Sequence, residues 1–246
     1  MPTIDEGTLA ELLNDDLSLR LVEPHIYSVG HDLESTNSYD KTFGSFYDRV
    51  ACSAIYNRIV WGYSISRFAS LTRDALASSK DGWVLDAGCG SLAFTAETYA
   101  SYAERPVILM DQSLKLLRMA KSRLIKMKGD IASHMVFLHA DALRLPFRPR
   151  AFNTIISLNL LHVLDDLSRL LKGLKSVLTE DGAMIFTSLV KSCRLADRYL
   201  AAWEKAGEVK SRDVVQLKAV FDKLGMPARY DTFGSMAFIR CGAIGN

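Results

Sequence analysis

The stretch that decides the fold reads Trp83-Val84-Leu85-Asp86-Ala87-Gly88-Cys89-Gly90-Ser91. Its first part is an apolar run of strand length that ends at Asp86. Gly88 and Gly90 follow directly, and glycine allows backbone angles and a close ligand approach that other residues resist. Residues 94–103 can then form a helix. A strand, a glycine turn and a helix in this order predict a pocket for a nucleotide-like ligand.

Beyond this stretch, apolar strands alternate with segments of helical spacing. We expect strands at 83–87, 107–110, 135–138, 152–157 and 183–188. Ser113 can cap the helix that follows the second strand, and Asp165 or Asp166 can cap the helix that follows the fourth. Strands that alternate with helices predict a parallel sheet with helices on both faces.

The C-terminal part leaves this alternation. Residues 192–206 have helical spacing, and Ser211 can cap a further helix that stops near Gly225. Two short strands follow at 228–233 and 236–241, and so short a connection predicts an antiparallel hairpin. The predicted fold class is therefore α/β: a doubly wound, mostly parallel, seven-stranded Rossmann-like sheet. An antiparallel C-terminal hairpin and an N-terminal helical extension complete it.

The N-terminal part has a different composition from the rest. Leucines at helical spacing predict a short helix within residues 1–35, and residues 46–79 are helical and rich in aromatic side chains. We expect a division into a helical extension or lid, residues 1–80, and a ligand-binding domain, residues 81–246. Deletion of residues 1–45 is expected to spare the sheet.

Composition excludes several classes of protein. The chain has 246 residues, of which 49% are hydrophobic and 24% charged, and a net charge of +2, as in ordinary globular proteins. Its four cysteines form no CxxC pair, so no metal site is predicted. No apolar run is long enough to span a bilayer, and the N-terminus does not resemble a signal peptide. We expect a cytoplasmic protein, and the sequence indicates no oligomeric state.

Polar side chains follow four neighbouring strands, where a doubly wound sheet binds its ligands. They are Asp86, Asp111, Asp141 and Asn159. The carboxylate of Asp111 can accept hydrogen bonds from both hydroxyls of a ribose, since it has two acceptor oxygens. Asp141 can accept from an adenine amino group, and Asp86 from an ammonium. Each also has a structural alternative: Asp111 can cap the next helix, and Asp141 can form a turn before Pro146.

These residues carry a resemblance. Val84-Leu85-Asp86-Ala87-Gly88-Cys89-Gly90 resembles motif I of the class I S-adenosylmethionine-dependent methyltransferases, and Ile108-Leu109-Met110-Asp111-Gln112-Ser113 resembles their ribose-binding strand end. His139-Ala140-Asp141-Ala142 is similar to their adenine-contacting segment, and Asn159-Leu160-Leu161-His162 to their motif after the fourth strand. The resemblance covers about residues 80–241. It implies S-adenosylmethionine as cofactor, bound by Asp86, Gly88, Cys89, Gly90, Asp111, Gln112, Asp141, Ala142 and Asn159.

The N-terminal segment around Tyr47 and Tyr56 more loosely resembles the small-molecule branch of this family, which includes the ubiquinone and menaquinone C-methyltransferases. That resemblance implies a small methyl acceptor, with Tyr47 and His162 at the substrate. His162 could act as a base or could be a histidine at the edge of the core, and we favour the second reading. No catalytic residue is predicted. One departure from the family is Leu92, where family turns often carry a third glycine.

The aromatic residues outside the regular alternation are candidates for the acceptor pocket. We expect its walls to be Tyr47 and Tyr56 before the first strand and Tyr199 and Trp203 after the fifth. Aromatic walls favour a small, planar or lipophilic acceptor over a nucleic acid.

Three other functions stay open at this point. An NAD-dependent oxidoreductase fits the Gly88–Ala93 turn, but it gives Asp141 no role. An RNA methyltransferase fits the nine basic residues of 115–150, although most of these fall on the solvated face of a helix. A non-catalytic regulatory protein that binds S-adenosylmethionine fits the lack of an identified base.

Overall fold

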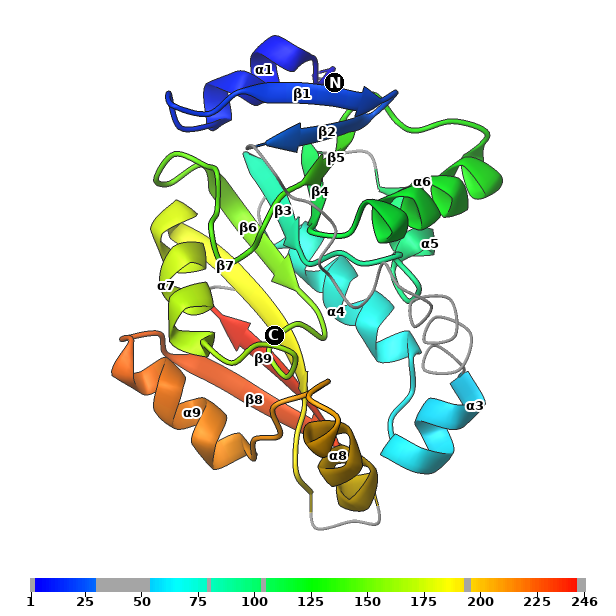
Figure 1. Ribbon diagram of the computed structural model, residues 1–246, viewed down its shortest axis with the longest axis vertical. Coiled ribbons are helices and arrows are strands. Elements are labelled where there is room, and N and C mark those ends of the chain that lie inside the picture. Colours follow the sequence, from blue (N-terminus) through cyan, green and yellow to red (C-terminus); the bar gives the residue numbers. More distant parts are fainter. Residues whose placement is uncertain (1–2, 30–53, 79–80, 103–104, 193–195, 243–246) are drawn as a thin grey trace.

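One mixed β-sheet organises the computed structural model, which describes residues 3–29, 54–78, 81–102, 105–192 and 196–242. Within these residues the sheet has nine strands in the order β1-β2-β5-β4-β3-β6-β7-β9-β8 (Figure 1). The strands are β1 (Leu19–Glu23), β2 (Ile26–Val29), β3 (Trp83–Ala87), β4 (Val107–Asp111), β5 (Met135–His139), β6 (Phe152–Ser157), β7 (Leu178–Leu189), β8 (Ala228–Phe233) and β9 (Met236–Cys241).

The centre of the sheet is parallel, as the alternation of strands and helices predicts. β3 lies between β4 and β6, β5 pairs with β4, and β7 pairs with β6, all in parallel register. These central strands are buried along almost their whole length, as is usual for parallel strands covered on both faces. Their carboxyl ends, at Ala87, Asp111, His139 and Ser157, therefore lie along one edge of the sheet.

An antiparallel hairpin extends the sheet at each side. β8 and β9 form the predicted C-terminal hairpin, and β9 runs antiparallel to β7. At the other side β1 and β2 form a hairpin whose second strand pairs in parallel with β5. The sequence predicts no strands there, so the expected count of seven is wrong and the described residues contain nine. The division of the chain at residue 80 stays a prediction.

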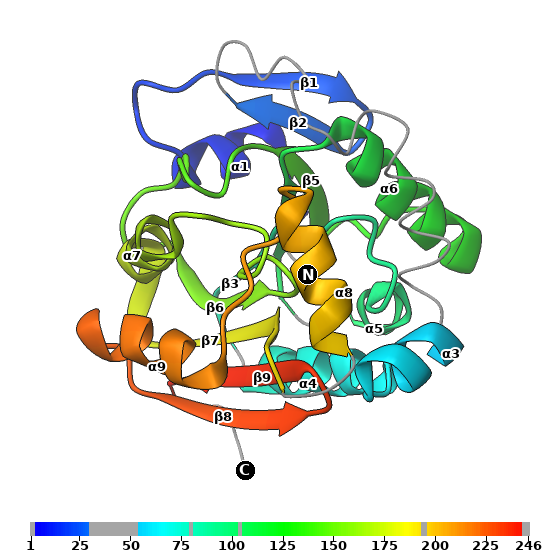
Figure 2. The same cartoon turned by 60° about the horizontal axis from the view of Figure 1, so that its bottom comes forward.

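The helices form two layers, and each layer has its own buried cluster against the sheet. Leucines and phenylalanines of α1 (Glu6–Leu12), α7 (Leu167–Val177) and α9 (Val214–Lys223) pack on one face. The other face carries the π-helical turn η2 (Asn57–Trp61), α4 (Ser66–Ala77), α5 (Ala96–Ser101), α6 (Leu114–Lys128) and α8 (Ala196–Lys205). In Figure 2, α7 and α9 lie on one side of the sheet and α4, α5 and α6 on the other. The short α3 (Ala54–Tyr56) precedes η2.

Side-chain caps begin several of these helices. The hydroxyl of Ser113 accepts a hydrogen bond from the backbone N–H of Leu116, and Asp166 accepts one from Arg169, as the sequence predicts. The prediction for Ser211 is wrong, because α9 begins two residues later at a capping box of Asp213 and Gln216. The Ser211 hydroxyl instead donates to the carboxylate of Glu204, at the end of α8.

A buried arginine ties one helix layer to the sheet. Arg105 is 2% exposed and lies just before β4. Its guanidinium donates to the carbonyl of Leu76 near the end of α4, to the hydroxyl of Thr154 on β6, and to the carbonyl of Asp81 before β3. Nε donates to the hydroxyl of Tyr102. The three nitrogens of one side chain thus donate to four polar groups at the edge of the sheet opposite the strand carboxyl ends.

Candidate functional site

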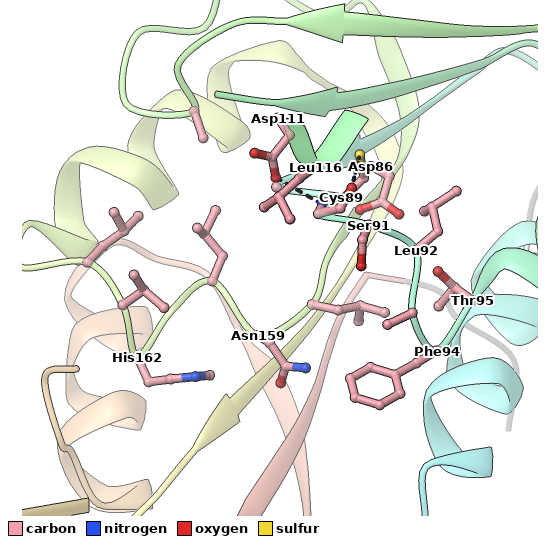
Figure 3. A pocket seen from close by; sticks show the side chains of 18 of the residues that line it. Asp86, Cys89, Ser91, Leu92, Phe94, Thr95, Asp111, Leu116, Asn159 and His162 are labelled. Carbon is pink, nitrogen blue, oxygen red and sulfur yellow. Dashed lines mark hydrogen bonds between the residues drawn. The ribbon is translucent and has the colours of Figure 1, made fainter. Parts of the chain in front are cut away.

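A pocket opens along the carboxyl ends of the central strands, where this topology places ligand sites. We call its two parts the glycine-turn end and the aromatic end. Figure 3 labels Asp86, Cys89, Ser91 and Asp111 of the first part and His162 of the second. The glycine-turn end is lined by Asp86, Gly88, Cys89, Gly90, Ser91, Met110, Asp111, Gln112, Asp141 and Ala142. The aromatic end is lined by Asn57, Trp61, Tyr63, His162, Leu189, Trp203 and Met236. Asn159 and its neighbours line the junction.

The glycine turn is held against the next strand by its backbone. The N–H groups of Gly88 and Cys89 both donate to the carbonyl of Met110, at 2.8 and 2.9 Å. Gly88 and Gly90 have φ of 78° and 56°, a left-handed backbone that favours glycine. A Cβ on Gly90 would meet no atom within 4 Å, because this residue faces the open pocket. The turn thus exposes bare backbone to a ligand.

Leu92 also has a left-handed backbone conformation, with φ of 55°. This observation explains why family turns carry a glycine at this position. Here a leucine adopts the conformation, and its side chain is 2% exposed, within the buried cluster that covers α4 and α5. Burial of an apolar side chain of this size offsets the backbone strain.

Asp111 ends β4 and bridges two loops. One carboxylate oxygen accepts from the N–H of Gly90 at 2.9 Å, and the other accepts from the N–H of Ser113 at 2.9 Å. Asp111 therefore fixes both the glycine turn and the start of α6, whose cap is Ser113 and not Asp111 itself. Each carboxylate oxygen has a second lone pair, so Asp111 can still accept from a ligand in the pocket.

Asp86 is the most electrostatically perturbed carboxyl group of the site. Its Oδ2 accepts from the hydroxyl of Tyr99 at 2.7 Å, whereas its buried Oδ1 has no hydrogen-bond partner among the described residues. Burial raises the pKa of Asp86 to about 7; the Tyr99 bond opposes this shift and nearby Asp111 adds to it. An unpaired buried acceptor is costly, so a cationic group bound here would satisfy Oδ1 and lower the pKa again.

Asp141 and Gln112 complete the polar rim of the glycine-turn end. The carboxylate of Asp141 accepts from the N–H of Leu143 at 2.8 Å, so it also makes the turn that the sequence allows. The carbonyl of Gln112 accepts from Nε2 of His139 at 3.1 Å. Nδ1 of that ring then accepts from the hydroxyl of Ser28 on β2, which connects the N-terminal hairpin to the pocket rim.

His162 is buried at the aromatic end. Its Nδ1 accepts a hydrogen bond from the backbone N–H of Leu189 at 3.1 Å, so the ring proton of the neutral imidazole is on Nε2. Burial, and to a smaller extent the charge of Arg212, lowers its pKa to about 4. A ring with one nitrogen engaged and the other protonated is a donor. These observations favour the non-basic reading of His162, while its contact with substrate stays a prediction.

Asn159 connects the two ends of the pocket. Its backbone has φ of 59°, which asparagine tolerates better than most residues. Its N–H donates to the Thr187 hydroxyl at 2.9 Å, and that hydroxyl donates back to Oδ1 of Asn159 at 3.1 Å. The side-chain NH2 group therefore points away from Thr187. In Figure 3, Asn159 and His162 extend from the same loop, opposite the cluster of Asp86, Cys89 and Asp111.

The structure brings together only some of the aromatic residues expected in the pocket wall. Trp203 lines the aromatic end and contacts Trp61, with ring centroids 5.5 Å apart. Tyr56 packs edge-on against Trp61 behind the lining residues. The prediction for Tyr199 is wrong, since it is 52% exposed and does not line the pocket. Tyr47 lies outside the described residues.

Sequence reasoning missed several lining residues. Trp61 and Tyr63 belong to the aromatic segment that the sequence points to, but nothing in their spacing distinguishes them from core residues. Met236 begins β9 and reaches the pocket because β9 pairs with β7, where it faces Leu189. Only the strand pairing could have revealed that approach. The predicted cofactor-binding residues all line the pocket, but their contacts with a ligand stay predictions.

Comparisons with known proteins agree with this geometry. Residues 85–186 match the family model described as a methyltransferase domain. The malonyl-[acyl-carrier protein] O-methyltransferase of Legionella pneumophila is 27% identical over 106 residues, which are 43% of this chain. The match spans only 36% of that relative's length.

Solved structures share the fold at low identity. A chain from the complex between the Haloferax volcanii Trm112 methyltransferase activator and a methyltransferase superposes with a TM-score of 0.65 at 12% identity, over 86% of this chain and 100% of that one. Geranyl diphosphate methyltransferase in complex with S-adenosylmethionine gives 0.56 at 12% identity, over 72% of this chain and 83% of that one.

Residues 85–186 therefore match a methyltransferase domain, and the solved structures share its Rossmann-like fold. This agrees with the resemblance seen in the sequence and supports S-adenosylmethionine as the cofactor of the domain. Among the described residues, no helix is long and apolar enough to cross a membrane. The cytoplasmic location stays a prediction.

Proposed function

We propose that this protein transfers a methyl group from S-adenosylmethionine to a small acceptor with a lipophilic body. The observation that carries the proposal is a single pocket with two chemically different ends. One end has the exposed glycine turn and three carboxylates, and the other has two tryptophans, a leucine and a methionine. A polar cofactor and an apolar acceptor can therefore meet in one water-excluding space.

The residues at the glycine-turn end match the parts of the cofactor. In the proposed complex, Asp111 accepts hydrogen bonds from the ribose hydroxyls, and Asp141 with the backbone of Ala142 borders the adenine. The unpaired Oδ1 of Asp86 accepts from the ammonium of the methionine part, which explains a buried carboxylate oxygen without a partner. Gly88, Cys89, Gly90 and Gln112 supply backbone around the cofactor, and Asn159 lies where its sulfonium would meet the acceptor.

Methyl transfer from a sulfonium requires little chemical activation by the protein. The electrophile is already activated, so the chain has to align the acceptor with the methyl group and exclude water. Buried aromatic side chains at one end and fixed backbone at the other provide that alignment. The acceptors named for the similar proteins differ from one another, so they do not identify the acceptor of this chain.

An RNA acceptor is less well supported, because several of the basic residues that favoured it already bind groups of the protein itself. Arg118 and Lys121 of α6 both pair with Glu23, and the guanidinium of Arg123 donates to the carbonyl and hydroxyl of Ser91. These groups stabilise the N-terminal hairpin and the glycine turn. A small-molecule acceptor is the better match to a pocket whose aromatic end is lined by buried side chains.

Calorimetric titration and turnover test the proposal together. The protein is titrated with S-adenosylmethionine, with its homocysteine product and with NAD, and product formation is then measured with a panel of small acceptors. We expect binding of the first two ligands and turnover with at least one lipophilic acceptor. Cofactor binding without any turnover would favour a regulatory protein, and binding of NAD alone would refute the proposal.

A further inference from the structure

The region around the aromatic end presents two neutral N–H donors. Nε2 of His162 carries the ring proton because Nδ1 accepts from Leu189. The NH2 group of Asn159 is free of Thr187 because that hydroxyl donates its proton to Oδ1. Neither donor has an acceptor among the described residues, and both residues line the pocket. Both donors belong to residues that line the pocket, so an oxygen of the bound acceptor can accept a hydrogen bond from each.

The described residues of the aromatic end include no group that could remove a proton. Only Tyr63 and His162 among them can titrate. The hydroxyl of Tyr63 donates to Oδ1 of Asn57 at 2.5 Å, and the free lone pair of His162 is engaged by Leu189. The carboxylates that line the pocket, of Asp86, Asp111 and Asp141, lie at the glycine-turn end. An acceptor that meets only these described residues needs a nucleophilic lone pair that is already free.

The electrostatics of this end favour a negative charge. The guanidinium of Arg212 donates to the carbonyls of Leu161 and Leu164, which flank His162 in the same loop. Burial is the main cause of the lowered pKa of His162, and the positive charge of Arg212 adds to it. A cation that opposes protonation of a histidine also favours an anion near the same ring, although Asp165 and Glu204 offset part of the charge of Arg212.

We propose that the methyl acceptor is an organic carboxylate with an apolar body, held by N–H groups of His162 and Asn159 and methylated on a carboxylate oxygen. This inference rests on the proposed function and adds its substrate class. The carboxylate fits all three observations, because it is ionised at neutral pH, accepts several hydrogen bonds and needs no base. The apolar walls formed by Trp61, Trp203 and Met236 contact the rest of the molecule.

The reaction balances without a proton transfer. A lone pair of the carboxylate oxygen forms the new C–O bond to the methyl carbon, and the C–S bond breaks with its electrons remaining on sulfur. The products are a neutral methyl ester and the thioether S-adenosylhomocysteine. Because the carboxylate and the sulfonium neutralise each other, an environment that excludes water favours this step.

Matched probes test the substrate class. The protein with S-adenosylmethionine is incubated with octanoate or phenylacetate, with the corresponding amides, and with octylamine and phenol. Release of S-adenosylhomocysteine and formation of a base-labile methyl ester are measured. We expect turnover with a carboxylate and none with its amide. Faster methylation of the amine or the phenol than of either carboxylate would overturn the inference.

Variants test the two donors. Asn159→Asp keeps the acceptor for Thr187 but replaces the donor with a charge, and we expect carboxylate turnover to fall at least on the order of a hundredfold. His162→Asn keeps an acceptor for Leu189 and loses the distal donor, whereas His162→Gln keeps a distal N–H. We expect a loss on the order of ten- to a hundredfold in kcat/KM for His162→Asn and a smaller one for His162→Gln.

Calorimetry separates this inference from the proposed function. The His162 variants should bind S-adenosylmethionine close to wild-type affinity, which also shows that they fold. A wild-type protein that fails to bind this cofactor contradicts the proposed function. A protein that binds the cofactor but neither binds nor methylates the two carboxylates contradicts only the present inference. Equal carboxylate affinity of Asn159→Asp and wild type contradicts it as well.

Discussion

Asp86 illustrates how one buried carboxyl group connects stability with ligand binding. Its pKa of about 7 in the folded protein lies above the ordinary value of 3.8 because the group is buried, so folding disfavours its ionised form. The corresponding free-energy penalty is fully present above pH 7 and disappears as the pH falls from about 7 toward 4. A cationic ligand at Asp86 therefore stabilises the protein most above pH 7, where the free-energy penalty of the unliganded protein is largest.

Asp86→Asn should therefore stabilise the cofactor-free protein at pH 8, by up to about 4 kcal/mol, and change it little near pH 4. The same variant should bind S-adenosylmethionine about ten- to a hundredfold more weakly, because the ammonium loses a charged partner. Urea denaturation at the two pH values and calorimetry measure these effects. Asp130→Asn, at a position 85% exposed, is the control. A stability gain of Asp86→Asn that does not depend on pH would contradict this account.

Two opposing effects determine how Leu92 influences the free energy of unfolding. A left-handed backbone costs an L-residue about 1–2 kcal/mol, which glycine would recover. Loss of a buried leucine side chain costs about 2–5 kcal/mol. We therefore expect Leu92→Gly to lower the free energy of unfolding by about 1–3 kcal/mol, measured by urea denaturation. A variant more stable than the wild type would show that strain in the turn outweighs burial.

At the scale of the elements, Arg105 joins α4, β3 and β6 through one guanidinium. Arg105→Met keeps much of the side-chain volume but leaves the Thr154 hydroxyl and two backbone carbonyls without their donor. We expect a loss of about 2–4 kcal/mol in the free energy of unfolding, since the Thr154 hydroxyl and the Leu76 carbonyl are buried. Arg229→Met removes an arginine side chain that is 66% exposed and should cost under about 0.5 kcal/mol. Equal effects of the two substitutions would mean that the hydrogen bonds of Arg105 do not contribute to the stability of the fold.

The elements also show which parts of the fold the sequence could predict. β3, β6, β8 and β9 have the predicted bounds, because apolar runs and turn residues delimit them in the sequence itself. β1 and β2 escaped prediction because β1 is half exposed and interrupted by charged residues. These strands form because β2 pairs with β5, which lies more than a hundred residues later in the chain. The local sequence does not indicate so distant a partner.

The same reasoning applies to the site. Asp86, Asp111, Asp141 and Asn159 follow strands, and parallel topology brings the ends of strands together whatever the details of packing. That half of the pocket is predictable from the order of the elements. The aromatic end combines η2, the loop after β6, α8 and the start of β9. Their meeting depends on tertiary packing of segments outside the regular alternation, so the sequence suggested aromatic walls but selected Tyr199 wrongly.

At the scale of the whole molecule, the N-terminal hairpin is part of the sheet and of its core. Leu9, Leu13 and Val29 belong to the same buried cluster as β3, β4 and α7. The hairpin also reaches the pocket rim, because Ser28 donates to His139, which in turn donates to the carbonyl of Gln112. Residues 6–29 therefore lie too deep in the fold for their removal to leave the sheet intact. This arrangement revises the expectation that deleting residues 1–45 spares it.

A matched pair of substitutions in the hairpin tests this role without deleting any of the chain. Ile26 begins β2, is 0% exposed and pairs with Phe137 of β5, whereas Leu21 on β1 is 54% exposed. We expect Ile26→Ser to lower the free energy of unfolding by about 2–4 kcal/mol, because it removes buried apolar surface and places a hydroxyl in the core. Leu21→Ser should change it by under about 0.5 kcal/mol. Urea denaturation measures both, and S-adenosylmethionine affinity of Ile26→Ser reports whether the rim at Gln112 moves with the hairpin. If the two variants are equally stable, the hairpin is an appendage and the division of the chain at residue 80 gains support.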